Sequence, residues 1–283
     1  MTIDPNHIPV LLRQAGIRPK KSLGQNFLID PHSLQKVTLA AGIAAGENIL
    51  EIGAGLGNLT VHLCREAGHV IAVEIDQRLI PLLREQLSGV ENVTIIHGDI
   101  LEIDPASLNL APGYVVVANI PYYITSAILR HLLEAAVKPA RMVLTVQKEV
   151  AQRVTAAPGE LSLLALSVQV YGKPRIVAHI PAACFYPAPD VDSVMLQVDL
   201  YPQPLIAAQH LDDFFHVIRA AFSQKRKTLR NALSSGLALP TNETAAWLQA
   251  ADIDPMRRAE TVSLPEWSRL IMSYSSMMPR RKS

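Results

Sequence analysis

The sequence predicts an α/β fold, in which helices cover both faces of a parallel sheet, followed by a small all-helical domain. Short apolar runs alternate with helical segments between residues 48 and 154, as in repeated β-α units. After residue 204 the helical segments continue, with no strand-like run between them. The length of 283 residues is enough for about two such domains.

Each expected element of the first domain rests on its own run of residues. The expected strands, all rich in Val, Ile or Leu, are 48–52, 69–74, 93–97, 114–118, 141–146 and 193–200. The expected helices between them are 59–65, 77–87, 126–136 and 147–154. One further strand is expected at either 162–170 or 175–180, and the pattern leaves both alternatives open.

A proline-rich stretch at residues 201–204 (YPQP) marks a change in the pattern. Beyond it, the segments 212–222, 225–233, 245–251 and 265–274 all have the apolar spacing of helices. We therefore predict two domains. The first spans 1–204 and begins with a basic arm over 1–21, and the second is a helical domain over 205–283 that contacts RNA or the ribosome.

The formal net charge of +1 hides an uneven distribution of charge. Residues 1–21 hold four basic residues and one acid, residues 22–204 eleven and seventeen, and residues 205–283 eleven and seven. Phosphate contacts need several clustered cations, because binding is driven by the release of counterions. Basic flanks around an acidic middle therefore favour a polyanion as partner. The RNA-binding candidates are Lys20, Lys21, Arg219, Lys225, Arg226, Lys227 and Arg230.

Composition excludes several classes of protein. With 49% hydrophobic and 18% charged residues, the chain is not of the disordered type. No apolar run reaches the ~18 residues of a membrane span, and the first residues do not resemble a secretory signal. We therefore expect a cytoplasmic protein with no membrane partner. The two cysteines, Cys64 and Cys184, lie far apart and outside any ligand cluster, so we expect no disulfide framework and no metal. We also expect a monomer.

A glycine-rich turn and two acids predict a pocket for an adenosine. Gly53 and Gly55 follow the first strand directly, where glycine lets the backbone approach a ligand closely. Glu74 ends the second strand, where an acid can accept from both ribose hydroxyls, and Asp99 ends the third, placed to accept from an adenine amino group. Because Asn58 stands where a dinucleotide GxGxxG motif needs glycine, S-adenosylmethionine fits better than NAD.

The hydrophobic residues that follow these two acids directly, Ile75 and Ile100, are assigned to the same cofactor pocket.

The fourth strand ends in residues suited to methylation of an adenine amino group. The lone pair of that amine is delocalised into the ring, which makes it a poor nucleophile. The amide oxygen of Asn119 and a backbone carbonyl of Ile120 or Pro121 can accept its two N–H groups and favour a pyramidal nitrogen. Tyr122 offers a face for a flipped base, and Phe185 can stack on the other face. No strong general base is needed, because attack makes the nitrogen acidic, and catalysis is then mostly positioning.

Six motifs occur in order along the chain: KSLGQNFL at 21–28, GAGLG at 53–57, NIPY at 119–122, QKEV at 147–150, FYPAPDVDS at 185–193 and FSQKRKTLRN at 222–231. Together they resemble the ribosomal RNA adenine N6,N6-dimethyltransferase family, and specifically its small-subunit branch, whose loss gives kasugamycin resistance. The resemblance implies a Rossmann-like class I methyltransferase sheet plus a helical domain. It also implies transfer of four methyl groups to two adjacent adenines near the 3′ end of 16S rRNA, within a small ribosomal subunit or its precursor.

Carried over onto matching positions, the resemblance also implies roles for single residues. Asn26 and Leu28 would close over S-adenosylmethionine, and Gly53 would lie against its methionine part. Glu74 would hold the ribose, and Asn119 would bridge cofactor and target. Asp99, the acid that ends the third strand, would hold the adenine of the cofactor.

Four alternatives remain beside this interpretation. The nearest is the large-subunit branch, which methylates one adenine of 23S rRNA and confers macrolide resistance, but the basic segment after residue 222 favours the small-subunit branch. A non-catalytic assembly or transcription factor on the same fold is opposed by the presence of Glu74, Asp99 and Asn119. A DNA adenine methyltransferase usually has two prolines where Ile120 and Pro121 stand. The missing glycine opposes an NAD dehydrogenase.

Overall fold

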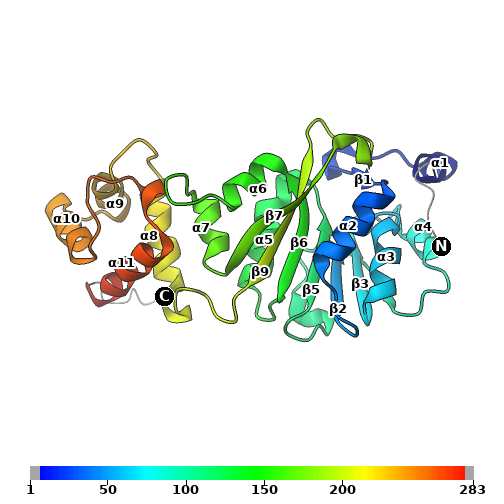
Figure 1. The fold of residues 1–283 in the computed structure, drawn as a ribbon, viewed down its shortest axis with the longest axis horizontal. Helices are drawn as coiled ribbons and strands as arrows, with labels where there is room; N and C mark the ends of the chain where they lie inside the picture. Colours follow the sequence, from blue (N-terminus) through cyan, green and yellow to red (C-terminus); the bar gives the residue numbers. More distant parts are fainter. Residues whose placement is uncertain (1–6, 278–283) are drawn as a thin grey trace. The chain divides into compact units, whose positions relative to one another are not determined.

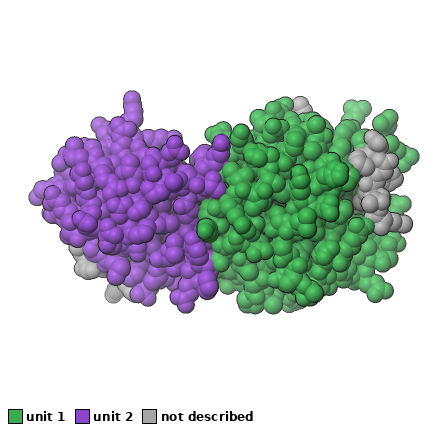
Figure 2. Space-filling view, viewed as in Figure 1, with its two compact units in different colours: residues 1–151, 173–200 green, residues 152–172, 201–283 purple. Residues whose placement is uncertain are grey.

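The structure, a computed structural model, describes residues 7–277, without the side chains of residues 7, 21 and 275–277. The side chain of Lys21 and the beginning of the predicted basic arm thus lie outside the described residues. The chain divides into two compact units, one of residues 1–151 and 173–200 and one of residues 152–172 and 201–283 (Figure 2). This division differs from a single cut after residue 204, because residues 152–172 group with the C-terminal helices.

The first unit is built around one mixed sheet of seven strands (Figure 1). In spatial order they are β4 (Val93–His97), β3 (His69–Glu74), β2 (Asn48–Ile52), β5 (Val115–Asn119), β6 (Arg141–Gln147), β9 (Ser193–Leu200) and β7 (Gly172–Ile180). A separate antiparallel pair joins β1 (Phe27–Leu28) to β8 (Phe185–Tyr186). The predicted strands are therefore present, and the open alternative resolves in favour of a strand that includes 175–180.

The parallel sheet predicted from the β-α alternation is confirmed for five strands, and the later strand β9 departs from it. Strands β4, β3, β2, β5 and β6 run parallel, but β9 pairs antiparallel with β6. The connection from β7 to its neighbour β9 holds only the short 3-10 helix Ala182–Cys184 and β8. Connections without a long crossover helix join antiparallel neighbours, whereas parallel neighbours need a crossover.

Helices cover both faces of the sheet. In the view of Figure 1, α2 and α3 lie in front of the sheet and α5 lies behind it. The helices of this part of the chain are α1 (His7–Gln14), α2 (Pro31–Ala41), α3 (Asn58–Glu66), α4 (Ile80–Gln86), α5 (Thr125–Glu134) and α6 (Lys148–Val154). The unpredicted α2 begins where the Asp30 carboxylate caps the Ser33 amide, and it ends at the left-handed Gly42.

One hydrophobic core of the first unit lies between the sheet and the helices α2 and α3. Ile49 of β2 and Val115 of β5 pack there with Val37 of α2 and Leu63 of α3, and all four are at most 2% exposed. Parallel strands buried on both faces have nearly continuous apolar runs, as β3 and β5 do, whereas Glu51 interrupts the run of β2. This packing fixes the strand ends from which the site residues project.

The second unit is helical. Its helices are α7 (Leu163–Gln169), α8 (Leu211–Phe222), α9 (Leu229–Leu237), α10 (Thr241–Ala250) and α11 (Leu264–Met277). This unit also contains the short 3-10 helices Ala208–His210 and Ala259–Thr261, and the first unit contains Lys21–Leu23, Pro105–Leu108 and Tyr122–Ile124. Within residues 7–277, none of the helices is long and apolar enough to cross a membrane.

The helix predicted at 225–233 begins later than expected. Residues 225–227 form a turn in which the Lys227 amide donates to the Gln224 carbonyl, and α9 starts only at Leu229. Thr228 has extended backbone angles at the N-cap. Three consecutive cations at the positive end of a helix dipole are unfavourable, which explains why the turn precedes the helix.

Candidate active site

The glycine-rich loop after β2 packs directly against the end of β5. Gly53, Gly55 and Gly57 have φ angles of 78°, 59° and 85°, which L side chains rarely adopt. A Cβ atom on Gly53 would lie 2.8 Å from the backbone oxygen of Asn119. The loop therefore needs glycine at position 53 both for its conformation and for its close approach to the next strand.

Glu74, at the end of β3, holds this loop in place. Its side chain is buried, and its two carboxylate oxygens accept from the backbone amides of Gly55 and Asp76, each at 2.8 Å. Burial raises the pKa of Glu74, although these amide hydrogen bonds oppose the rise. The acid predicted to bind a ribose thus also fastens the glycine loop to β3.

A second buried acid, Asp76, was missed by sequence reasoning. Its carboxylate accepts from the side-chain amide of Gln25 at 2.8 Å and from the Arg78 guanidinium at 2.6 and 2.9 Å. The hydrogen bond from Arg78, followed by that from Gln25, lowers the pKa of Asp76 to about 2, against burial. The signal in the sequence was a second acid two residues after Glu74, but its partner Gln25 lies 51 residues away.

Asn119, the last residue of β5, has a side-chain orientation fixed by its partner. Its Nδ2 donates to the backbone carbonyl of Asn26 at 3.0 Å. A carbonyl cannot donate, so only the amide nitrogen can face it. The side-chain oxygen of Asn119 therefore points away from Asn26, and among residues 7–277 no group donates to it.

The remaining residues of the NIPY turn are buried or partly buried. Ile120 is buried. Pro121 packs against Gly24 so closely that a Cβ atom added to Gly24 would lie 2.7 Å from the Cβ atom of Pro121. The Tyr122 hydroxyl lies 2.6 Å from the Ser193 hydroxyl at the start of β9, and burial raises the pKa of Tyr122. The ring of Tyr122 is thus held at its far end.

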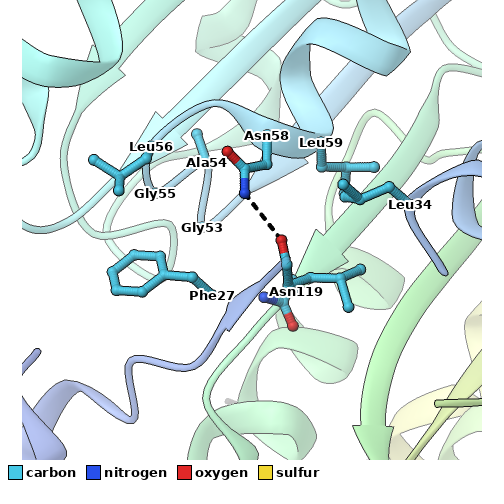
Figure 3. A pocket seen from close by; sticks show the side chains of 10 residues that line it. Phe27, Leu34, Gly53, Ala54, Gly55, Leu56, Asn58, Leu59 and Asn119 are labelled. Carbon is cyan, nitrogen blue, oxygen red and sulfur yellow. Dashed lines mark hydrogen bonds between the residues drawn. The ribbon is translucent and has the colours of Figure 1, made fainter. Parts of the chain in front are cut away.

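Residues 23–27 cross the carboxyl ends of the strands and form one wall of a pocket. This pocket is also lined by Gly53, Gly55, Glu74, Ile75, Asn119 and Pro121. Adjoining space is lined by Phe27, Leu28, the glycine loop, Asn58 and Asn119 (Figure 3). Asn58 donates to the Leu28 carbonyl at 3.0 Å, and its buried side-chain oxygen has no partner within the described part of the chain.

The structure thus brings together most of the predicted cofactor residues: Asn26, Leu28, Gly53, Gly55, Glu74, Ile75 and Asn119. Ile75 is 46% exposed, which is unusual for isoleucine and leaves an apolar surface beside Glu74.

Asp99 and Ile100 do not line these two pockets. Asp99 follows β4 and accepts from the Leu101 amide at 2.9 Å, while Ile100 is buried. The Gly98 amide donates to the Glu74 carbonyl, so Asp99 lies one residue from a direct contact with the end of β3. Its contact with an adenine stays a prediction.

Phe185 lies in the core. It is 4% exposed and belongs to the same hydrophobic cluster as Leu28 and Leu34. Its backbone pairs with Leu28 in the β1–β8 ribbon. The structure gives this residue a packing role, and stacking on a target base stays a prediction.

Glu51 lies in β2, two residues before Gly53 of the glycine loop, and is 1% exposed. Neither of its carboxyl oxygens has a hydrogen-bond partner among the described residues. Burial, reinforced by the nearby Glu74 carboxylate, raises the pKa of Glu51 to about 8. This carboxyl is therefore largely neutral near pH 7 and adds little charge beneath the pocket.

The candidate RNA-binding residues occupy both units. Lys20 is exposed in the first unit. In the second unit, Arg219 is exposed on α8, the residues at 225–227 are exposed in the turn, and Arg230 is half-buried on α9. No acid lies between Arg219 and Arg230.

Comparison with known proteins identifies the family. The pattern of the family described as Ribosomal RNA adenine dimethylase matches residues 16–275. The Ribosomal RNA small subunit methyltransferase A of Dehalococcoides mccartyi is 45% identical over 260 residues, covering 92% of this chain and 89% of that protein. A dimethyladenosine transferase from Plasmodium falciparum superposes with a TM-score of 0.77 at 27% identity, covering 88% of this chain and 98% of that one.

The 23S rRNA methyltransferase ErmE superposes with a TM-score of 0.72 at 28% identity, covering 87% of this chain and 98% of that one. These likenesses confirm the predicted Rossmann-like methyltransferase fold and the family resemblance drawn from the motifs. The chain therefore belongs to the ribosomal RNA adenine dimethylase family and is a methyltransferase.

Proposed function

We propose that this enzyme transfers methyl groups from S-adenosylmethionine to the exocyclic amines of two adjacent adenines near the 3′ end of 16S rRNA. The substrate is a small ribosomal subunit or its precursor. The observation that carries the proposal is the fixed carboxamide of Asn119, whose oxygen is left to accept from an incoming amine beside the glycine loop. The location that follows from such a substrate is the cytoplasm, and we expect a monomer.

The residues around the pocket fit S-adenosylmethionine in chemical type. The glycine loop leaves room that a Cβ would fill, and the Glu74 carboxylate keeps unused lone pairs for ribose hydroxyls. The unpartnered oxygen of Asn58 suits the ammonium group of a methionine part. Ile75 offers an apolar surface for an adenine ring. S-adenosylmethionine, when bound, supplies an electrophilic methyl group on its sulfonium.

The end of β5 supplies the positioning that an adenine amine needs. The Asn119 oxygen accepts one N–H of the amine, and the backbone carbonyl of Ile120 accepts the other. Pro121 is the weaker candidate for that second contact, because its carbonyl already accepts the Ile124 amide at 3.2 Å. Two acceptors below the amine favour a pyramidal nitrogen, and its proton leaves to water after attack. Rate acceleration then comes from orientation and exclusion of water.

Tyr122 is the candidate platform for the flipped base. Its hydroxyl is tied to Ser193, so the ring plane is fixed before a base arrives. Aromatic faces stack on bases of any sequence, which makes stacking a means of holding the base rather than of choosing it. Phe185 joins this platform only with a rearrangement that frees it from the core.

The choice between the two ribosomal subunits rests on the relatives. The relative from Dehalococcoides mccartyi, 45% identical, is named for the small subunit, whereas ErmE, named for 23S rRNA, is 28% identical. The basic turn at residues 225–227 matches the motif that suggested the small-subunit branch. Its exposure suits phosphate contacts.

The test is to incubate the enzyme with radiolabelled S-adenosylmethionine and either unmethylated small subunits or unmethylated large subunits. We expect label only in the small subunit, at two neighbouring adenines near the 3′ end of 16S rRNA. Label in 23S rRNA alone would assign the enzyme to the large subunit. Absence of label from both subunits, with the donor bound, would favour a non-catalytic assembly factor.

A further inference from the structure

A second concave surface of the first unit lies away from the cofactor pocket. It is a groove between the C-terminal half of α2 and the strands β6, β9 and β7, and Arg141, its lining residue on β6, opens that strand. The parallel strands begin at this edge, whereas Asn119 and the glycine loop lie where they end. The groove is therefore separate from the site described above.

The groove is lined by basic side chains from three elements that are distant in sequence. Lys36 comes from α2, Arg141 from β6, and Arg175 and His179 from β7. Within the described part of the chain, the lining includes no acidic residue and no Phe, Tyr or Trp. The positive charge of this lining differs from the charge of the surrounding sequence, because residues 22–204 hold seventeen acids and only eleven basic residues.

One partly exposed acid beside the groove, Asp199, pairs with both arginines. The Asp199 carboxylate accepts from Arg141 at 2.6 Å and pairs with Arg175 at 3.6 Å. Arg141 also donates to the Ala41 carbonyl at the end of α2. The Arg175 side chain remains 57% exposed. Arg141 is thus a fixed part of the wall, while Lys36 and Arg175 present their charges to solvent.

We propose that this groove binds the sugar–phosphate backbone of the ribosomal RNA substrate, outside the methylated segment. The proposal rests on the proposed function, which supplies a polyanion much larger than the two target adenines. Lys36, Arg141 and Arg175 outnumber their one neighbouring acid, Asp199, and such a surplus of clustered cations attracts phosphates, because binding releases counterions. A lining without aromatic rings does not suit stacked bases, so the contact is independent of sequence. It orients the enzyme on the particle rather than selecting the base.

The test compares the salt dependence of binding to unmethylated small subunits for the full chain and for Lys36→Gln/Arg175→Gln. For two lost phosphate contacts, the slope of log affinity against log salt becomes shallower by about 2 units. Arg130→Gln is the matched control, because Arg130 is also an exposed arginine paired with one acid, Glu134, but lies on α5. We expect the control to keep the wild-type slope. A wild-type slope in the double variant would overturn the proposal.

Crosslinking distinguishes RNA from an acidic ribosomal protein as the occupant. Arg175→Cys carrying an azidophenacyl group is bound to small subunits and irradiated. An adduct with 16S rRNA supports the proposal, and an adduct only with a ribosomal protein overturns it. Labelling of the adenines by the wild-type chain is measured on the same subunits. Correct labelling with an unchanged slope rejects the groove alone, whereas absence of labelling rejects the proposed function.

Discussion

The carboxyl edge of the sheet and the basic turn at residues 225–227 are built in opposite ways. At the sheet edge, Glu74, Asp76 and Asn119 each have named hydrogen-bond partners within 3.0 Å, and these side chains are at least partly buried. In the turn, three consecutive cations are exposed to solvent. Transfer of a methyl group needs atoms held within fractions of an ångström, whereas attraction of a polyanion needs only charge density.

Because of this contrast, substitutions in the two regions should have different effects. A substitution at the sheet edge should act on turnover or on folding, with little dependence on salt. A substitution in the turn should act on binding and on its salt dependence, and leave the chemistry intact. Substitutions at both places test this separation, from the largest expected effect to the smallest.

Replacement of Asn119 should have the largest effect. Asn119→Ala removes the oxygen proposed to accept from the amine, and removal of one such preorganised group costs about 10²–10³-fold in turnover. Donor binding should remain measurable by calorimetry, because Glu74 and the glycine loop are unchanged. Single-turnover methylation of small subunits measures the loss. Turnover near the wild-type rate would show that the carboxamide does not orient the amine.

Neutralising the basic turn should act on binding. Lys225→Gln/Arg226→Gln/Lys227→Gln should make the slope of log affinity against log salt shallower by about 1 unit for each lost phosphate contact. At saturating subunit concentration the methylation rate should stay close to that of the wild type. Arg130→Gln again serves as the control. A slope equal to that of the wild type would remove the turn from the RNA interface.

Asp76 should make the sheet edge sensitive to acid. The pKa of Asp76 is lowered from 3.8 to about 2 in the folded state, so the carboxylate stabilises the fold above pH 3.8 by about 2 kcal/mol. This contribution is lost as the pH falls from about 4 to about 2. Asp76→Asn should lower the free energy of unfolding at pH 7 and flatten its dependence below pH 4, as measured by denaturant titration. If the free energy of unfolding of the variant falls below pH 4 as it does in the wild type, the Gln25–Asp76–Arg78 network is excluded as the cause of the acid sensitivity.

The Tyr122–Ser193 hydrogen bond should give the smallest effect. A neutral hydrogen bond contributes about 1 kcal/mol, so Ser193→Ala should weaken transfer by about fivefold. Tyr122→Phe should give a similar loss, because it removes the same bond and keeps the ring. The double variant should be no worse than either single variant, since both remove one interaction. Strictly additive losses in kcat/KM would mean that the two hydroxyls act separately.

The local features of this protein are well predicted by its sequence. Apolar runs predict strands that end at Ile52, Glu74 and Ala118, and in the structure the last of these ends one residue later. The rule that ligands bind beyond the carboxyl ends of parallel strands brings these ends together. The sequence alone therefore places Glu74 and Asn119 at one pocket, as the structure does, and their roles there stay predictions. Their spacing along the chain follows from the repeated β-α units.

Hydrogen-bond partners that lie far apart along the chain cannot be predicted from a single sequence. The contacts from Asn119 to Asn26 and from Gln25 to Asp76 span 93 and 51 residues, and no periodicity relates them. The antiparallel entry of β9 depends on the connection from β7 rather than on its own residues. Apolar spacing predicts helix at 225–227 because it does not register the repulsion of consecutive cations from a helix N-terminus.

The central claim is that the donor lies at the carboxyl edge of the sheet, between the glycine loop, Glu74 and Asn119. The most direct measurement is a crystal structure of the enzyme soaked with S-adenosylmethionine. We predict ribose hydroxyls on the Glu74 carboxylate and the sulfonium methyl group facing the Asn119 side chain. A donor bound elsewhere in the first unit, or an Asn119 side chain turned away from it, would contradict the account.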